Sequence, residues 1–87
     1  MNVERWLKSK RLSWQQLEDL LKVVDKRGLK ALDRQQLREL GRLYRATSAD
    51  LSRARALKLS NEVQVYLNNL VVKAHNQVYQ THDDRLG

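Results

Sequence analysis

Apolar side chains recur every three or four residues along three stretches of the chain, at residues 14–24, 37–54 and 63–78. This spacing places them on one face of an α-helix, because each residue advances the helix by about 100°. Three helices that turn such faces inward can share one core. The pattern therefore predicts an all-α fold, an antiparallel three-helix bundle.

Capping residues predict where the first two helices begin and end. Ser13 with Gln16 forms a capping-box pattern before the first stretch, and Gly28 suits the left-handed turn that follows a helix. Asp33 with Gln36 repeats the capping-box pattern before the second stretch. We therefore expect helices that start after Ser13 and Asp33.

The other helix ends are marked less sharply. The second helix meets no stop residue before positions 58–61, and either Ser60 or Asn61 is suited to cap the third. Apolar residues within 2–7 predict a short N-terminal helical turn, capped by Asn2, that folds over one end of the bundle.

Composition limits the chain to one small helical domain. It has 87 residues, 41% of them hydrophobic, with no Pro and no Cys. We expect residues 1–80 to form a single domain and the polar residues 81–87 to form a flexible tail. The lack of Cys excludes disulfides and favours a reducing compartment. We find no apolar run that would span a bilayer and no signal peptide.

The second helix carries a row of arginines on the side away from its apolar face. Seventeen Lys and Arg against ten Asp and Glu give a net charge of +7, which attracts phosphate, acidic lipid head groups or an acidic protein. Glu39 with Arg42 and Asp50 with Arg53 are spaced for local pairing, so the row can be a solvated helix face. Asp50 and Arg55 lie at the edges of the apolar face, where either can pair with another helix. The candidate residues for contact with an anionic surface are Arg34, Arg38, Arg42, Arg45 and Arg53.

The third helix has a second apolar stripe nearly opposite its core face. Val65, Val72 and Tyr79 recur every seven residues among asparagines. An isolated bundle exposes such a stripe, which indicates a partner: a second copy, another protein or a missing part of this one. The alternative is that these are scattered surface apolar residues of no special role.

Residue patterns typical of catalysis are absent. His75 and His82 stand seven apart without Cys or acidic residues at metal-ligand spacing, so we predict no metal site. The sequence has no glycine-rich phosphate loop and no evident nucleophile with its base. We therefore predict a non-enzymatic chain with no catalytic residues and no cofactor.

Nucleic-acid binding is the main alternative to a protein partner. A pI near 10.2 and the arginine row satisfy the charge requirement. No short turn sets up a recognition helix, and Glu39 and Asp50 interrupt the basic row. A membrane surface is a further candidate, since Arg5, Lys8 and neighbouring basic residues surround Trp6.

Four segments together resemble the amino-terminal region of the stage II sporulation protein M family of bacterial integral membrane proteins. These segments are "MNVERWL", "SWQQLEDLL", "LRELGRLYRATSADLSRARAL" and "YLNNLVVKAHNQVY". The resemblance runs from about Asn2 to Tyr79. Its most specific parts are Leu43, Tyr44 and Arg45 with Ala49, Asp50 and Leu51, and Tyr66, Leu67 and Asn68 with Ala74 and His75.

The resemblance implies a place in the cell. In that family a helical segment outside the membrane precedes several membrane-spanning helices, and the sporulation members act in a membrane complex for peptidoglycan remodelling. It implies a cytoplasmic head at the inner face of the bacterial cell membrane in the full-length protein, or a stand-alone relative. The family provides no agreed catalytic residues to assign here. We expect a protein-interaction domain of a membrane-associated assembly.

Overall fold

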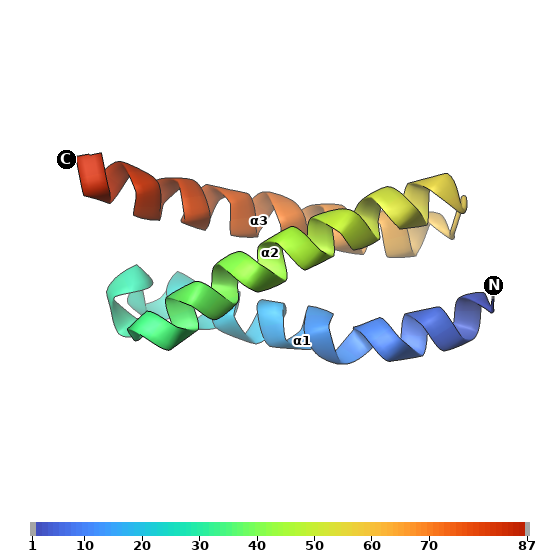
Figure 1. Ribbon diagram of the computed structural model, residues 1–87, viewed down its shortest axis with the longest axis horizontal. Helices are drawn as coiled ribbons and strands as arrows, with labels where there is room; N and C mark the ends of the chain where they lie inside the picture. Colours follow the sequence, from blue (N-terminus) through green and yellow to red (C-terminus); the bar gives the residue numbers. More distant parts are fainter. Residues whose placement is uncertain (1, 87) are drawn as a thin grey trace.

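The computed structural model describes residues 2–86, and the side chains of residues 2–79. It contains α1 (Val3–Arg27), a 3₁₀ turn η1 (Leu29–Ala31), α2 (Arg34–Ala56) and α3 (Asn61–Leu86). Figure 1 shows that α1 and α3 run in the same direction and α2 runs opposite to both. The predicted all-α, antiparallel three-helix bundle is therefore confirmed.

The first helix starts at Val3, eleven residues earlier than the Trp14 start that the Ser13 signal predicts. Asn2 caps α1 as expected, since its side-chain oxygen accepts a hydrogen bond from the backbone N–H of Arg5 at 3.1 Å. The helix then runs through Ser13 without a break. The predicted N-terminal helical turn is the first part of α1, not a separate turn that folds back. Helical spacing continues from Trp6 and Leu7 into Trp14, so one continuous helix keeps all three in reach of the core.

The turn after α1 and the start of α2 match the prediction. Gly28 adopts φ +83° and its N–H donates to the carbonyl of Val24 at 2.8 Å, which ends α1. Asp33 and Gln36 form the complete capping box, each side chain accepting from the other's backbone N–H. Both helix ends are therefore set by local chemistry.

The second connection is short. α2 ends at Ala56, and Lys58 takes a positive φ of 54° in the turn. The hydroxyl of Ser60 then accepts from the N–H of Val63 at 3.3 Å, which selects Ser60 as the cap of α3. The backbone of α3 continues as helix to Leu86. We also predicted that residues 81–87 form a flexible tail. The side chains of these residues, and all of residue 87, lie outside the part of the chain that the structure describes.

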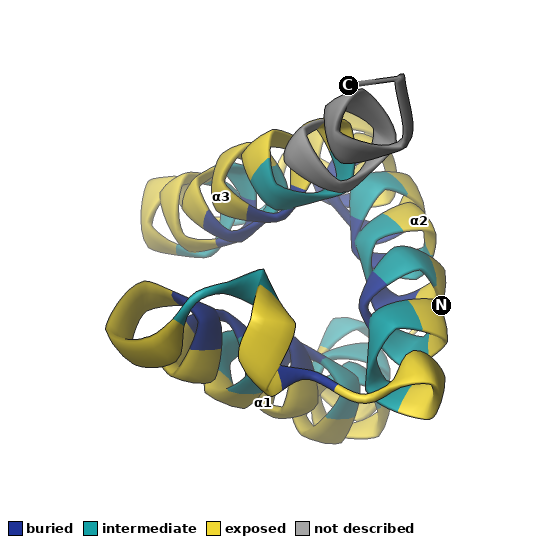
Figure 2. Ribbon diagram, turned by 90° about the vertical axis from the view of Figure 1, so that its left-hand side faces the viewer, coloured by how far each residue is buried: buried dark blue, intermediate teal, exposed yellow. Residues whose placement is uncertain are grey.

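The core lies between the three inward faces, and α2 forms its centre. α2 packs against both α1 and α3, as Figure 2 shows in the end-on view. Leu40, Thr47, Leu51 and Ala54 are buried on α2 as the periodicity predicts. Leu43 of α2 is fully buried as well, beside these residues. A helix with neighbours on two sides buries a wider arc than a single seam.

Candidate interaction surfaces

The predicted second stripe of α3 lies on the outside of the bundle. Val65, Val72 and Tyr79 are 47%, 49% and 59% exposed, whereas Leu67 and Ala74 on the inner face are fully buried. The neighbours of the stripe on the same side of the helix include no Asp, Glu, Lys or Arg: Asn68, Asn69, His75 and Asn76. We call the three residues Val65, Val72 and Tyr79 the outer stripe. It is an apolar and uncharged surface on a chain that is otherwise rich in charge.

One end of the outer stripe is held by aromatic contacts that the sequence alone does not reveal. The ring of Tyr79 lies 4.6 Å from the ring of His75, centroid to centroid. His75 in turn contacts α2, since its Nδ1 lies 2.9 Å from the hydroxyl oxygen of Tyr44. Thirty-one residues separate Tyr44 from His75, so no local spacing predicts this contact. The ring of Tyr79 therefore packs on His75, a side chain that is itself held by its contact with α2.

The arginine row faces away from the core, as expected. All five arginines of the row are exposed: Arg34, Arg38, Arg42, Arg45 and Arg53. Arg42 pairs with Glu39, and that hydrogen bond lowers the pKa of the Glu39 carboxyl and raises that of Arg42. Among residues 2–79 the other four form no ion pair with a carboxylate. Most of the row is free to meet an anionic surface.

Of the two interactions expected for Asp50, a local pair with Arg53 and a pair with another helix, the structure shows the second. The indole Nε1 of Trp14 donates to Oδ2 of Asp50 at 2.9 Å, and Nζ of Lys10 lies 3.6 Å from Oδ1. Asp50 is only 5% exposed and faces α1, so the predicted local pair with Arg53 does not form. The prediction that Asp50 pairs with another helix is confirmed. A buried carboxylate with two donors fixes how α1 and α2 pack and is explained without a ligand.

Arg55, at the other edge of α2, reaches α3. Its guanidinium Nη2 donates to the side-chain oxygen of Asn68 at 3.3 Å. The partner is a neutral amide, so the predicted ion pair of Arg55 is replaced by a hydrogen bond from its cationic guanidinium to an uncharged acceptor. This contact ties α2 to the part of α3 that borders the outer stripe.

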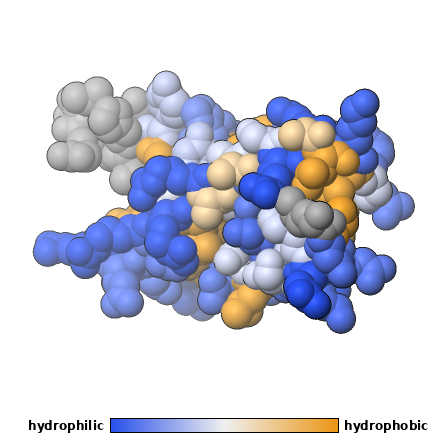
Figure 3. Space-filling model, turned by 45° about the vertical axis from the view of Figure 1, so that its right-hand side comes forward, coloured by the Kyte–Doolittle hydropathy of each residue, from blue (hydrophilic) through white to orange (hydrophobic). Residues whose placement is uncertain are grey.

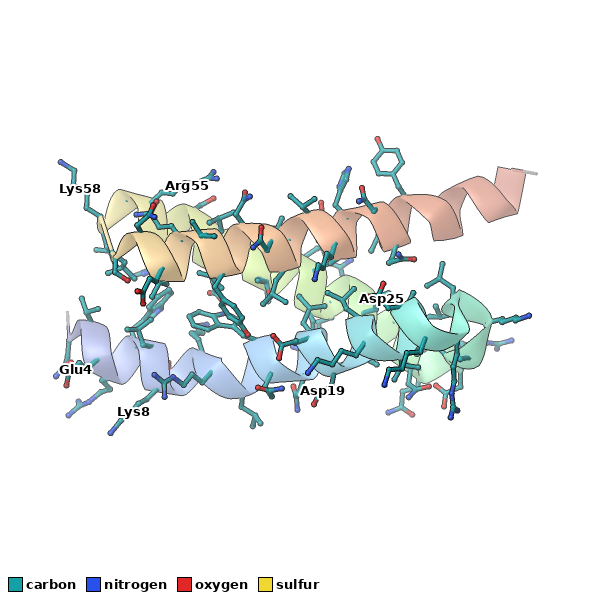
Figure 4. All side chains as sticks on the ribbon, turned by 180° about the vertical axis from the view of Figure 1, so that it is seen from behind. Glu4, Lys8, Asp19, Asp25, Arg55 and Lys58 are labelled. Carbon is teal, nitrogen blue, oxygen red and sulfur yellow. The ribbon has the colours of Figure 1, made fainter. Side chains whose placement is uncertain are left out.

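Sequence reasoning missed two neighbouring hollows between α1 and α3 that together form a groove. Its wide end encloses about 700 Å³ and its narrow end about 210 Å³, and Tyr66 lines both. Leu12, which is 69% exposed, lies in the wide end beside the buried Trp14. Figure 4 looks onto this side, with α1 and α3 in front of α2. Figure 3 views the molecule from the α2 side, where the surface is mostly hydrophilic and apolar atoms gather toward the end of the molecule where α1 begins and α2 ends. We call this feature the α1–α3 groove.

Burial affects the chemistry of Tyr66 in this groove. Partial burial raises the pKa of its phenol, and the nearby carboxylates of Glu18 and Asp19 raise it further. The ring of Tyr66 also meets that of Trp14 edge to face, with the centroids 6.3 Å apart. Tyr66 is therefore a neutral aromatic wall of the groove at physiological pH.

Two classes of site are not found in the part of the chain that the structure describes. No group of three or more His, Asp or Glu side chains there comes together in a way that suits a metal ion. Within the same residues, no helix contains an apolar stretch long enough to cross a membrane.

Comparison with known proteins places the chain in a family. Residues 4–80 match the model of a domain of unknown function, DUF8413, and the chain belongs to this family. No curated protein and no solved structure shows significant similarity to the chain.

Proposed function

We propose that the chain is a non-catalytic protein-interaction domain that associates through the outer stripe of α3. The observation that carries the proposal is the contrast between the stripe and the rest of the surface. Val65, Val72 and Tyr79 are about half exposed and have uncharged neighbours, although 31% of the chain is charged. An apolar strip without charges along four turns of a helix is typical of a helix–helix contact.

A second copy of the chain is the partner that fits the outer stripe best. Val65 and Tyr79 each lie seven residues from Val72. In an antiparallel pair of α3 helices with its twofold axis at Val72, Val72 meets Val72 of the other copy and Val65 meets Tyr79. The same pairing sets Asn68 against Asn76, where two amides can exchange hydrogen bonds. The sequence of the stripe is thus self-complementary.

Charge does not oppose this pairing. A net charge of +7 makes two copies repel each other at most orientations. On α3 the stripe and its immediate neighbours include no Asp, Glu, Lys or Arg, and Lys73 is turned about 100° around the helix from Val72. The guanidinium of Arg55, bonded to Asn68, lies at the border of the strip. Copies that meet along this strip therefore keep their arginine rows out of the contact.

The expected association is weak. From Val65 to Tyr79 the helix rises about 21 Å, so the contact buries less surface than the roughly 1,200 Å² of a standard interface. We expect a dissociation constant of about 10 μM to 1 mM. Such a contact acts within an assembly where other parts hold the copies close together.

The assembly that we propose is membrane-associated, as the resemblance to the stage II sporulation protein M family implies. Four of the five arginines of the row lack an ion pair with any described carboxylate. An anionic membrane surface attracts such residues by about 1 kcal/mol each when they are close to it. In this proposal the domain is the cytoplasmic head of a longer protein, with the arginine row toward the inner leaflet and the outer stripe between copies.

Sedimentation equilibrium at several protein concentrations tests the self-association. The wild-type chain is expected to show a mass that rises with concentration, and Val72→Glu is expected to remain monomeric up to 1 mM. Val23→Glu is the matched control, because Val23 is an exposed valine on α1 at 36% exposure. A wild-type chain that stays monomeric at 1 mM, or equal loss in both variants, contradicts the proposal.

Nucleic-acid binding is a second candidate, supported by the same four unpaired arginines. Binding to phosphates releases counterions, so its affinity falls steeply with salt. Titration with duplex and single-stranded DNA at about 50 and 200 mM salt distinguishes the two candidates. No binding at the lower salt removes this alternative, whereas binding that is lost in Arg38→Ser with Arg45→Ser supports it.

A further inference from the structure

We infer that the α1–α3 groove is a docking site for an amphipathic helix of a partner protein, one whose carboxylates lie at the end of the groove where α1 begins. This inference is independent of the self-association proposed above, because none of Val65, Val72 and Tyr79 lines the groove, although Asn69 borders both surfaces. The argument rests on the floor of the groove, its length and the charges at its rim.

The floor is apolar and includes large side chains that remain exposed to solvent. Leu12 is 69% exposed and Tyr66 37%, and both line the wide end with Leu7 and Val63. Trp14 contributes a buried ring at the same place. Covering Leu12 and Tyr66 removes apolar surface from water at about 25 cal/mol per Å², so an apolar stripe on a partner binds here favourably.

The length suits a helix. The groove runs along α1 from Leu7 to Asp25 and along α3 from Glu62 to Lys73. On α1 this is about 27 Å at 1.5 Å per residue, close to the length of an 18-residue helix. A helix laid between two others that run in the same direction completes a four-helix bundle, in which each helix has two neighbours. Its apolar positions at i, i+3, i+4 and i+7 would meet the floor.

The rim charges indicate which partner fits. Lys8 and Arg11 stand on the α1 wall of the wide end, and within residues 2–79 neither forms an ion pair. The first part of α1 is basic, with Arg5, Lys8, Lys10 and Arg11 against Glu4 alone, and Lys10 already serves Asp50. Glu62 is the one acidic residue that lines the wide end, on the α3 wall.

The narrow end differs in charge. At this end Lys22 pairs with Glu18 at 3.7 Å. The two other charged residues that line it, Asp25 and Lys73, have opposite charges, so this end has no net charge. The positive character of the rim is therefore confined to the α1 wall of the wide end. A partner helix with carboxylates beside its apolar stripe at that end is complementary, and a basic partner is repelled by Lys8 and Arg11.

The test uses a defined peptide and residue-resolved NMR of the full chain. The probe is an acetylated and amidated 18-residue peptide with a leucine stripe at helical spacing and three glutamates beside the stripe at one end. A matched peptide has lysines in place of these glutamates. We expect the acidic peptide to saturate with a dissociation constant of about 10–300 μM and to shift the amide signals of Leu12, Val63 and Tyr66. The lysine peptide is expected to bind at least tenfold more weakly.

Chain variants separate the groove from the outer stripe. Leu12→Glu is expected to weaken the acidic peptide more than tenfold, and Lys8→Glu with Arg11→Glu to reverse the preference between the peptides. Val72→Glu is the matched control and is expected to bind the acidic peptide like the wild-type chain, even where it abolishes self-association. Circular dichroism checks that each variant stays folded, which the exposure of Leu12 favours.

Other outcomes overturn the inference. The groove does not bind a helix if the acidic peptide fails to saturate at 1 mM. The same conclusion follows if the amide signals that shift are confined to Val65, Val72 and Tyr79. Equal binding of both peptides contradicts the acidic partner. Saturable binding of dodecanoate at the groove without binding of either peptide assigns the groove to an acyl chain instead of a helix.

Discussion

The two faces of α3 are both apolar, but they meet different surroundings. On the inner face Leu67 and Ala74 are fully buried against the other helices, and on the outer face Val65 and Val72 are about half exposed. The inner face is explained by the fold, since its removal from water stabilises the bundle. The fold does not explain the apolar residues of the outer face, because they stay about half exposed to water. They are therefore available for contact with a partner. Substitutions on the two faces therefore separate stability from binding.

The largest expected effect lies on the inner face. Leu67→Ala removes three carbons from a fully buried site and is expected to lower the free energy of unfolding by about 3 kcal/mol. Urea denaturation followed by circular dichroism measures it. A loss below about 1 kcal/mol would mean that α3 packs loosely on both faces and would remove the contrast.

A polar contact in the core gives the next largest effect. Trp14→Phe removes the indole donor from Asp50 and leaves that buried carboxylate with Lys10 alone. We expect a loss of about 1–3 kcal/mol in the free energy of unfolding. Trp6→Phe is the control, because Trp6 is only partly buried, and it is expected to cost less than half as much. Equal losses would show that ring volume, not the hydrogen bond, sets the effect.

On the outer face the same kind of change is expected to leave stability almost unaltered. Val72→Glu places a carboxylate at a position 49% exposed, and we expect the free energy of unfolding of the monomer to change by less than about 0.5 kcal/mol. Dilute samples in urea give this value without interference from association. A loss above about 1.5 kcal/mol would mean that Val72 belongs to the core.

The smallest effect concerns Tyr66, between the two faces. Its raised pKa means that the folded chain holds the phenol proton more tightly than the unfolded chain does. This contribution to stability is complete below the ordinary tyrosine pKa of about 10 and is lost as the pH rises through the folded value. Absorbance near 295 nm is expected to show an ionisation step above the ordinary tyrosine range, and Tyr66→Phe is expected to remove that late step. A late step that persists in the variant contradicts the assignment.

Local chemistry made most of the fold predictable. The Asp33 capping box and Gly28 act on backbone groups only a few residues away, so their roles follow from the sequence. For the cap of α3 the sequence left Ser60 and Asn61 open, and the structure selects Ser60. The Ser13 pattern is also a local signal, but it gave a wrong helix start. Its capping signal competes with helical spacing that continues from Trp6 to Trp14, and burial of those rings favours an unbroken helix.

The surfaces were less predictable because they depend on how the helices pack. Periodicity alone places the outer stripe opposite the core face of α3, and the structure has it there. The same periodicity does not show that Asp50 turns toward Lys10 and Trp14, because partners 36 or more positions away are brought close only by packing. The α1–α3 groove is a property of two helices together, so neither helix predicts it alone.

Cross-linking through single cysteines tests the proposed pairing of outer stripes most directly, because the chain has no native Cys. With a short bismaleimide, the account predicts that Val72→Cys links to itself and that Val65→Cys links to Tyr79→Cys in a mixture. Val65→Cys alone and Tyr79→Cys alone are expected to link much less. Efficient linking of each variant only to itself would show a parallel pair, and no linking above that of Val23→Cys would contradict self-association through α3.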